Sequence, residues 1–433
     1  METVDLLLIT GYPDNIANRK IISQRLRNME TIAPFREEFI YNNLMYMTAG
    51  HVAEILGGAS FEELIRSRIF KPLNMTDASF MADLDFNQNV ARPYDKENDT
   101  LLESDTYLYR VHSLSPAGTV CASPRDYSKW LMFLLSNATT IDGERLIEDS
   151  LWRDMWKGRQ YIGDAAETSY NLYKPFPYFR SASSYATAWF RSNYRGHKVM
   201  FHSGSFHAYS ALAVVHPNAK SAFMLTINGP WPLKFSNDVV PLSYVISDIL
   251  LNETRWLEVS DACSFPSRWI NVTSNHNRTI DVEKGYDNLT SENALMYIGR
   301  YGHPLKGEVD VYYNDGNLRA KTGFLTNVTF RYQPGNDTFD LTSDGSFQRV
   351  LNMYPTKVKF SELRNNVYNN MTLVSPRMKE THSFHRNINF DAVDSTETKS
   401  SKGSSFVCSI LILLTCFVSS RCSFSSKMFD FVY

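Results

Sequence analysis

The 433-residue sequence is poor in cysteine and lacks the cysteine spacings that bind metals. Its five cysteines are Cys121, Cys263, Cys408, Cys416 and Cys422. None forms a CxxC pair or stands at zinc-finger spacing from a histidine, so we predict no metal site and no cofactor. Three of the five lie in the C-terminal tail. Only Cys121 and Cys263 could pair within the globular part, and the sequence leaves that pairing open.

An excess of charge of either sign is also absent. The chain has 44 Lys and Arg against 46 Asp and Glu, a net charge of −2. With this balance the chain lacks the excess of positive charge that binding to a polyanion requires, so we predict no nucleic-acid partner. Aromatic residues make up 13% of the chain and charged residues 21%, the opposite of the composition of disordered chains. Most of the chain is therefore expected to fold, in more than one unit.

Four common catalytic signatures are missing, namely the GxxxxGK phosphate loop, the GxGxxG dinucleotide turn, HExxH and the GxSxG nucleophile elbow. A long hydrophobic run is missing too. The apolar segment 406–418 spans 13 residues, whereas a bilayer requires about 20. We therefore predict no membrane anchor.

The N-terminus has no basic region and no adequate apolar region, so we expect no signal peptide within these 433 residues. The chain nevertheless contains ten Asn-x-Thr acceptors, which are typical of surface loops in secreted proteins. These candidate glycosylation sites are Asn74, Asn98, Asn137, Asn252, Asn271, Asn277, Asn288, Asn327, Asn336 and Asn370. We expect a secreted, extracellular glycoprotein whose sequence is N-terminally incomplete here. The alternative is that the sequons are a chance excess.

The periodicity of apolar residues predicts a mixed architecture. Apolar residues recur at helical spacing from Tyr41 to Gly57-Gly58, and Ser60 with Glu63 forms a capping box for a second helix. A third helix is expected from Ser123 with Pro124 at its first position. Strands are expected at 187–190, 198–202, 210–215 and 222–227, and a further helix at 239–251.

The C-terminal part has a different pattern. Alternating residues on either side of Asp315-Gly316 predict a β-hairpin, with further strands at 328–332 and 339–342. We thus predict an α/β (α+β) fold, an antiparallel sheet flanked by helices, followed by a small antiparallel β domain. The expected domains are 1–260, a linker at 261–290, the β domain at 291–374, and a polar tail with a short apolar segment at 375–433.

Several short segments of the sequence resemble motifs of the serine β-lactamase and penicillin-binding-protein-like family, the S12 peptidase type. Tyr41-Asn-Asn43 followed by a helix is similar to the family's Tyr-x-Asn motif, and Pro72-Leu-Asn-Met75 to its Pro-Leu-Gly-Met phrase. His202-Ser203-Gly204 is similar to the His-x-Gly form of its third motif. The resemblance covers roughly residues 5–350 and implies a β-lactamase-like fold.

Neither short motif is specific by itself. Tyr-x-Asn also occurs at Tyr286, Tyr312 and Tyr368, and only the flanking helices select Tyr41. A literal Lys321-Thr-Gly323 exists, but it follows the hairpin of the appended β domain, so we do not assign it as the third motif. The structural alternative is that Tyr41 and Asn43 cap a helix and that His202 is a strand-end histidine.

The family's first motif, Ser-x-x-Lys, is absent, because no lysine of the chain follows a serine by three positions. Its serine would be the acylated nucleophile and its lysine the main cation favouring a tyrosine phenolate. Without them Tyr41 is expected to remain protonated. The resemblance therefore implies Tyr41 and His202 as the candidate catalytic residues, and Asn43 with Ser203, Gly204 and Ser205 as the candidate substrate-binding residues.

The resemblance implies a serine acyl hydrolase for small-molecule or peptide substrates with amide or ester bonds. The chain as given is expected to be inactive. The competing hypothesis is a non-catalytic extracellular protein, with partners in a mineralised matrix, that keeps the fold as a scaffold, because fold does not fix function.

Overall fold

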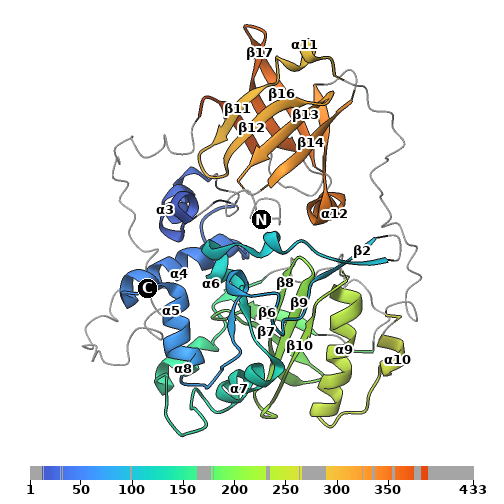
Figure 1. Cartoon of the computed structure of the whole chain (residues 1–433). Coiled ribbons are helices and arrows are strands. Elements are labelled where there is room, and N and C mark those ends of the chain that lie inside the picture. The colour runs from blue at the N-terminus through green and yellow to red at the C-terminus, as the bar shows by residue number, and fades with distance from the viewer. Residues whose placement is uncertain are drawn as a thin grey trace.

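The computed structural model of the chain describes residues 12–388, except for 13, 30, 32, 98–99, 163–176, 179, 231–234, 263, 266–288, 324, 334–336, 354–355 and 375–381. Two bodies follow one another along the chain, a mixed α/β domain and a β-barrel (Figure 1). This arrangement confirms the predicted fold class.

Helices of the first domain surround a six-stranded antiparallel sheet of order β10-β9-β8-β7-β6-β5. The sheet strands are β5 (Gln160–Tyr161), β6 (Ser181–Tyr185), β7 (Phe190–Tyr194), β8 (His197–Phe206), β9 (Tyr209–His216) and β10 (Ser221–Ile227). The main helices are α2 (Asp14–Ala17), α3 (Arg19–Arg25), α4 (Asn43–Gly57), α5 (Phe61–Ile65), α6 (Ser115–Gly118), α7 (Pro124–Leu135), α8 (Asp149–Met155), α9 (Phe235–Leu250) and α10 (Val259–Ala262).

Short elements connect these helices to the sheet. The short helical turns are η1 (Leu26–Asn28), η2 (Arg66–Phe70), η3 (Met81–Asp83), η4 (Thr106–Tyr109) and η5 (His112–Leu114). Two small antiparallel pairs are formed by β1 (Ser79–Phe80) with β4 (Val120–Cys121) and by β2 (Tyr94–Glu97) with β3 (Thr100–Glu103).

Local signals account for the helix boundaries. Asn42 caps α4 by accepting a hydrogen bond from the backbone N–H of Leu44, and Gly58 ends the helix in the left-handed conformation with φ 67°. The capping box of Ser60 and Glu63 begins α5, and Ser123 caps α7. These three predicted helix starts are confirmed.

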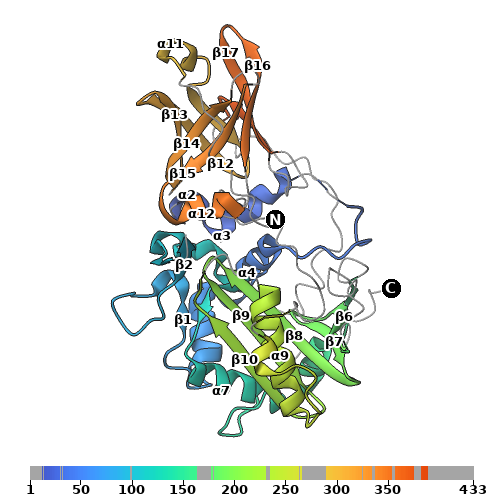
Figure 2. The ribbon, with the colours of Figure 1, turned by 90° about the vertical axis from the view of Figure 1, so that its right-hand side faces the viewer.

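The sheet buries both of its faces because successive side chains point in opposite directions. Met200 and Val215 pack in the cluster that contains Leu134 of α7. Their neighbours Val199 and Val214 pack in the cluster that contains Val239 of α9. Figure 2 shows α7 and α9 on opposite sides of β8, β9 and β10.

The C-terminal body is a closed barrel in which each strand pairs with its neighbour in sequence and β11 pairs with β18. Its strands are β11 (Gly299–His303), β12 (Gly307–Asn314), β13 (Asn317–Thr322), β14 (Leu325–Gln333), β15 (Thr338–Ser343), β16 (Lys357–Arg364), β17 (Val367–Val374) and β18 (His382–Arg386), with helices α11 (Ser291–Ala294) and α12 (Gly345–Met353). The barrel therefore extends past residue 374, where we expected it to end. β18 was missed because Phe384 is the only apolar residue among its five.

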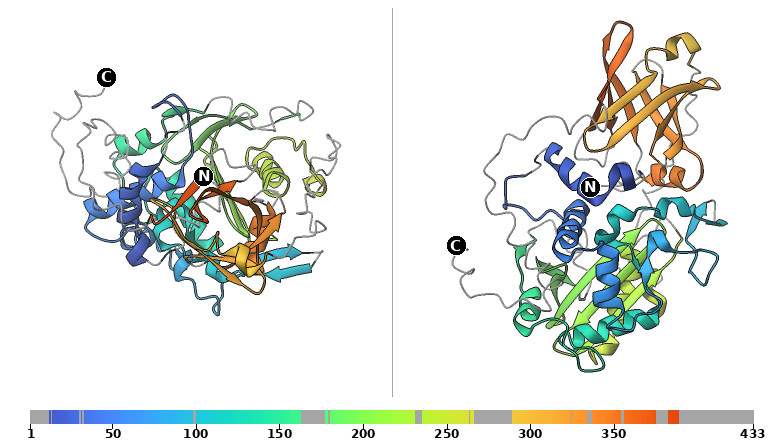
Figure 3. Two further views of the ribbon diagram at one scale, coloured as in Figure 1. Left: turned by 90° about the horizontal axis from the view of Figure 1, so that it is seen from above. Right: turned by 60° about the vertical axis from the view of Figure 1, so that its left-hand side comes forward.

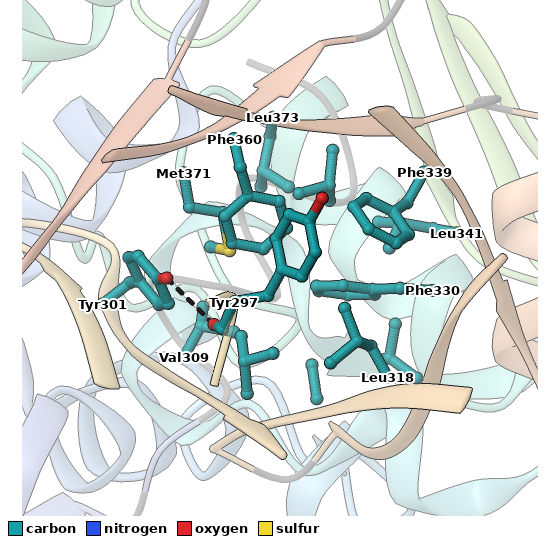
Figure 4. Packing of buried hydrophobic residues seen from close by; sticks show 14 of the residues in the cluster. Tyr297, Tyr301, Val309, Leu318, Phe330, Phe339, Leu341, Phe360, Met371 and Leu373 are labelled. Atoms are coloured by element: carbon teal, nitrogen blue, oxygen red, sulfur yellow. Dashed lines mark hydrogen bonds between the residues drawn. The ribbon is translucent and has the colours of Figure 1, made fainter. Parts of the chain in front are cut away.

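Side chains fill the space that the barrel strands enclose (Figure 4). The rings of Phe339 and Phe360 lie with their centroids 5.6 Å apart in an edge-on arrangement, and Tyr297 contacts both. The hydroxyl of Tyr301 donates to the backbone oxygen of Tyr297 at 2.9 Å. The barrel interior is thus a packed aromatic core.

The barrel is seated on the first domain beside α3, α4 and α6 (Figure 3). Leu305, at the turn between β11 and β12, packs among Ile22, Leu44 and Met47 of the first domain. The hydroxyl of Tyr12 accepts from the backbone N–H of Glu308 at 2.9 Å. Apolar and polar contacts together hold the two bodies against one another.

Among the described residues, no helix has the length and hydropathy that a membrane span requires. Within the same residues, no three or more His, Cys, Asp or Glu side chains are grouped so that they could hold a metal ion. The 406–418 segment, Cys263, Cys408, Cys416 and Cys422 lie outside the described residues.

Candidate active site

Tyr41 and Asn43 stand at the start of α4, the helix that the sequence predicted. Tyr41 precedes the helix and is 36% exposed, and Asn43 is its first residue and is half-buried. The capping side chain is that of Asn42, which lies between them. The site residues Tyr41 and Asn43 therefore flank the cap of the helix.

His202 lies on β8, and the fold brings it beside Tyr41. The centroids of the two rings are 5.7 Å apart. The Tyr-x-Asn and His-x-Gly segments, which are far apart in sequence, thus meet at one place on the first domain.

Ser203, Gly204 and Ser205 follow His202 along β8 and are exposed. They pair with Leu212, Ala211 and Ser210 of β9, whereas the pairing of β8 with β7 ends at Phe201. No other described strand pairs with β8 beyond that point. A Cβ added at Gly204 would meet no described atom within 4 Å, so the face of the strand is also uncrowded here. This segment is an open sheet edge able to receive an extended ligand.

Two tyrosines that the sequence did not indicate complete the site. The hydroxyl oxygens of Tyr46, on α4, and Tyr185, at the end of β6, are 2.5 Å apart. The hydroxyl of Tyr185 is 2.9 Å from His202 Nε2, and His202 Nδ1 is 2.7 Å from the backbone oxygen of Ser203. Tyr46 lies five residues after Tyr41 but belongs to no motif, and Tyr185 stands at a strand end, so local pattern could not identify either.

An aromatic wall surrounds this chain of hydrogen bonds. The ring of Tyr185 lies 5.0 Å from that of Phe39 and 4.8 Å from that of Phe190, centroid to centroid. Phe190 also contacts the ring of His202 at 5.2 Å. The wall removes water from the hydroxyl groups and from the imidazole.

Desolvation controls the protonation of the site. Burial among these rings, with a smaller effect from Tyr46, raises the pKa of Tyr41 to about 12. Burial also raises the pKa values of Tyr46 and Tyr185. It lowers the pKa of His202, and the hydrogen bond from His202 to the backbone oxygen of Ser203 opposes that lowering. At neutral pH the three tyrosines are therefore protonated and the histidine is neutral. This direction agrees with the expectation that Tyr41 is not a phenolate in this chain.

The literal Lys321-Thr-Gly323 sequence lies in the barrel. Thr322 ends β13 and is buried, and its side-chain oxygen is 3.0 Å from the hydroxyl of Tyr12. It belongs to the contact between the two bodies rather than to the site around His202.

The candidate glycosylation sites fall in different environments. Asn74, Asn137 and Asn252 are exposed, whereas Asn370 is half-buried in β17, with its Oδ1 buried and unpaired among the described residues. Asn327 lies in β14. The remaining five, Asn98, Asn271, Asn277, Asn288 and Asn336, lie outside the described residues.

A helix-flanked antiparallel sheet, with a Tyr-x-Asn helix start beside a His-x-Gly segment on one of its strands, defines the class of serine β-lactamases and penicillin-binding proteins. The sequence profile of the Beta-lactamase family matches residues 8–239, which is more than half of the chain. The chain belongs to this family.

Two curated relatives show how far the likeness extends. The unguisins hydrolase ungD' of Aspergillus campestris is 24% identical over 220 residues, covering 50% of this chain and 38% of that protein. Gigasin-6 of Magallana gigas is 31% identical over 124 residues, covering 28% of this chain and 41% of that protein. The chain thus spans well under half the length of these relatives.

Solved structures with a similar fold include the octameric penicillin-binding protein homologue from Pyrococcus abyssi. It has 18% identity and a TM-score of 0.43, over 88% of this chain and 77% of that one. The D-amino acid amidase from Ochrobactrum anthropi has 19% identity and a TM-score of 0.43, over 58% of this chain and 73% of that one.

Proposed function

We propose that this chain provides the substrate-binding side of a serine-hydrolase-type site for small molecules or peptides with amide or ester bonds. The observation that carries the proposal is the meeting of Tyr41 with His202 beside the open edge of Ser203 to Ser205. An extended ligand could add to this edge through backbone hydrogen bonds, next to the hydroxyl of Tyr41. The family membership supports the reaction class, and one relative is itself named a hydrolase.

We further propose that these 433 residues do not by themselves hydrolyse such compounds. No Ser-x-x-Lys occurs in them, so the acylated nucleophile of the family and its lysine are not available. The raised pKa of Tyr41 has the same consequence, because a protonated phenol cannot act as a general base at neutral pH.

Covalent labelling tests the second proposal. The 433-residue protein is incubated with a fluorescent penicillin and with a fluorophosphonate probe, and labelled protein is followed on denaturing gels. We expect no labelling above that of heat-denatured protein. Labelling of a specific serine in the folded protein would show that a nucleophile exists in this chain and would refute the proposal.

Ligand binding at the edge is tested separately, with benzylpenicillin and N-acetylphenylalanine methyl ester as probes in saturation-transfer NMR. Gly204→Leu places a side chain in the open space over this face of the strand, where it would crowd a ligand at the edge, and should abolish transfer without unfolding the protein. Gln24→Leu, at an exposed position of α3, is the matched control and should retain it. Equal transfer in the two variants would place binding elsewhere.

A second candidate function is a non-catalytic extracellular glycoprotein, with matrix partners, that uses the fold as a scaffold. Its support is the combination of a site that lacks the family's nucleophile with three exposed sequons, Asn74, Asn137 and Asn252. Expressed from its own gene in eukaryotic cells, the protein should appear in the medium and lose mass on enzymatic removal of N-glycans. An unmodified protein in the cytosol would refute secretion and glycosylation together.

A further inference from the structure

His202, Tyr185 and Tyr46 form a continuous line of hydrogen bonds across three elements, β8, β6 and α4. The line runs from the backbone oxygen of Ser203 through both ring nitrogens of His202 to the two tyrosine hydroxyls, at distances of 2.7, 2.9 and 2.5 Å. Both imidazole nitrogens are thus engaged by the protein itself, which leaves neither for a ligand.

The backbone oxygen of Ser203, at one end of this line, determines which group donates and which accepts in each hydrogen bond. The backbone oxygen of Ser203 can only accept, so His202 Nδ1 must carry a hydrogen. A neutral imidazole has one such hydrogen, so Nε2 must accept, and its donor is the hydroxyl of Tyr185. Because that hydrogen is then used, the oxygen of Tyr185 must accept from the hydroxyl of Tyr46.

The surroundings favour the neutral ring that this direction requires. Among the described residues, His202 contacts the rings of Tyr41, Tyr185 and Phe190, which are uncharged at neutral pH. Within the described part of the chain, the hydrogen bonds and ring contacts of His202 include no carboxylate, the group that would favour an imidazolium.

We propose that Tyr185, whose hydroxyl donates to Nε2 and accepts from Tyr46, is a positioning residue that holds His202 as the neutral Nδ1–H tautomer and thereby fixes the His202–Ser203 backbone at the start of the open edge. His202 is then a link between the tyrosines and the end of β8 that β7 does not pair, rather than a group that touches a ligand. The hydroxyl of Tyr41, which makes no hydrogen bond to a described residue, is the donor that faces the ligand. The importance of the edge rests on the proposed function, but the assignment of the tautomer does not.

The tautomer is tested on the full 433-residue protein labelled with ¹⁵N-histidine. Long-range ¹H–¹⁵N NMR at pH 7.5 distinguishes a ring protonated at Nδ1 from one protonated at Nε2, and His202→Asn identifies the signals of His202. We expect a single Nδ1–H pattern in the unmodified protein. A predominantly Nε2–H ring there would overturn the proposal, whatever the behaviour of any variant.

Two variants separate positioning from a general structural role. Tyr185→Phe removes the donor to Nε2 and leaves only the Ser203 oxygen to favour Nδ1–H, so the single pattern should give way to a mixture in which the Nε2–H ring is also populated. Tyr46→Phe leaves that donor in place and should retain the Nδ1–H pattern, as should the control Tyr41→Phe, which keeps the ring contact and alters no member of the line. An unchanged pattern in folded Tyr185→Phe would refute the role of Tyr185. The tautomer measurement uses no ligand. A result that contradicts the Nδ1–H tautomer would therefore not affect the proposed binding function, and a failure to bind the probes would not affect the assignment of the tautomer.

Discussion

Ser346 of the barrel helix α12 donates a hydrogen bond to Asp95 Oδ2 of the first domain at 2.9 Å. The other carboxylate oxygen of Asp95 lies 2.9 Å from His207 Nε2, and all three side chains are buried. His207 occupies the turn between β8 and β9 in the left-handed conformation, with φ 47°. The barrel is therefore connected, through one carboxylate, to the hairpin whose first strand carries the open edge.

Replacement of Ser346 by alanine is expected to lower the free energy of unfolding by about 1–3 kcal/mol, because the fully buried carboxylate of Asp95 loses a donor. The matched control is Ser343→Ala on β15, whose hydroxyl makes, among the described residues, only a 3.5 Å contact with the backbone oxygen of Asp344. The control should change stability by no more than about 0.5 kcal/mol. Chemical unfolding of the whole chain measures both, and equal stability of the two variants would show that the Ser346–Asp95 hydrogen bond contributes nothing to stability.

Features that depend on neighbouring residues were predictable from the sequence. The Ser60–Glu63 capping box, the left-handed Gly58 and the Asp315-Gly316 hairpin act within a few residues, and the structure contains all three. The strands around His202 contain short apolar runs that are buried on both faces of the sheet, such as Val199-Met200 and Val214-Val215, and such runs also leave a local signal.

Features that depend on tertiary contact were not predictable. Tyr185 joins the site because β6 ends beside α4, and Asp95 is buried because it meets a helix of the barrel, Ser346 lying far along the chain. Closure of the barrel required β18, in which Phe384 alone marks the inward face. No window of neighbouring residues contains this information, because the partners are brought together only by folding.

Replacement of Phe384 tests whether β18 is essential for the stability of the barrel. Its side chain is 0% exposed and belongs to the barrel core, so Phe384→Ala should cost about 3–5 kcal/mol through lost burial and the cavity left behind. Leu363→Ala, at a 52% exposed position near the β16–β17 turn, removes a comparable side chain from solvent and should cost far less. Thermal unfolding followed by near-ultraviolet circular dichroism reports on the aromatic core. A small effect at Phe384 would mean that β18 is dispensable.

His216 should make stability depend on pH. Its ring is buried at the end of β9, and burial, followed by the nearby Arg180 and His197, lowers its pKa from 6.5 to about 4. The unfolded chain therefore binds more protons than the folded one between these values, and stability falls as the pH falls from about 6.5 to 4. The loss should reach about 3 kcal/mol, and full stability from this group should be present above pH 6.5.

Denaturant unfolding at pH 7.5 and pH 4.5 measures this dependence. His216→Phe keeps a buried ring at the position but cannot be protonated, so its stability should fall less over the same interval, although it loses the 3.2 Å contact with Ser221. A variant with the same pH dependence as the unmodified protein would assign the effect to other groups.

Glycosylation at the exposed sequons is best tested through their threonines. Asn74, Asn137 and Asn252 all adopt left-handed backbone conformations, with φ of 53°, 54° and 55°, which asparagine tolerates better than other non-glycine residues. Asn137 also accepts a hydrogen bond from Trp152 Nε1 at 3.2 Å. Replacing these asparagines would therefore disturb the fold as well as the acceptor.

The variants Thr76→Ala, Thr139→Ala and Thr254→Ala remove the acceptor sequence and leave each asparagine in place. If the proposed glycosylation is right, each variant should migrate faster on a denaturing gel by the mass of one glycan, and the triple variant by the mass of three. Thr→Ser at the same positions preserves the acceptor sequence and should retain the original mobility. Identical mobility of the alanine and serine series would mean that these sites carry no glycans, and that their asparagines are explained by the left-handed turns alone.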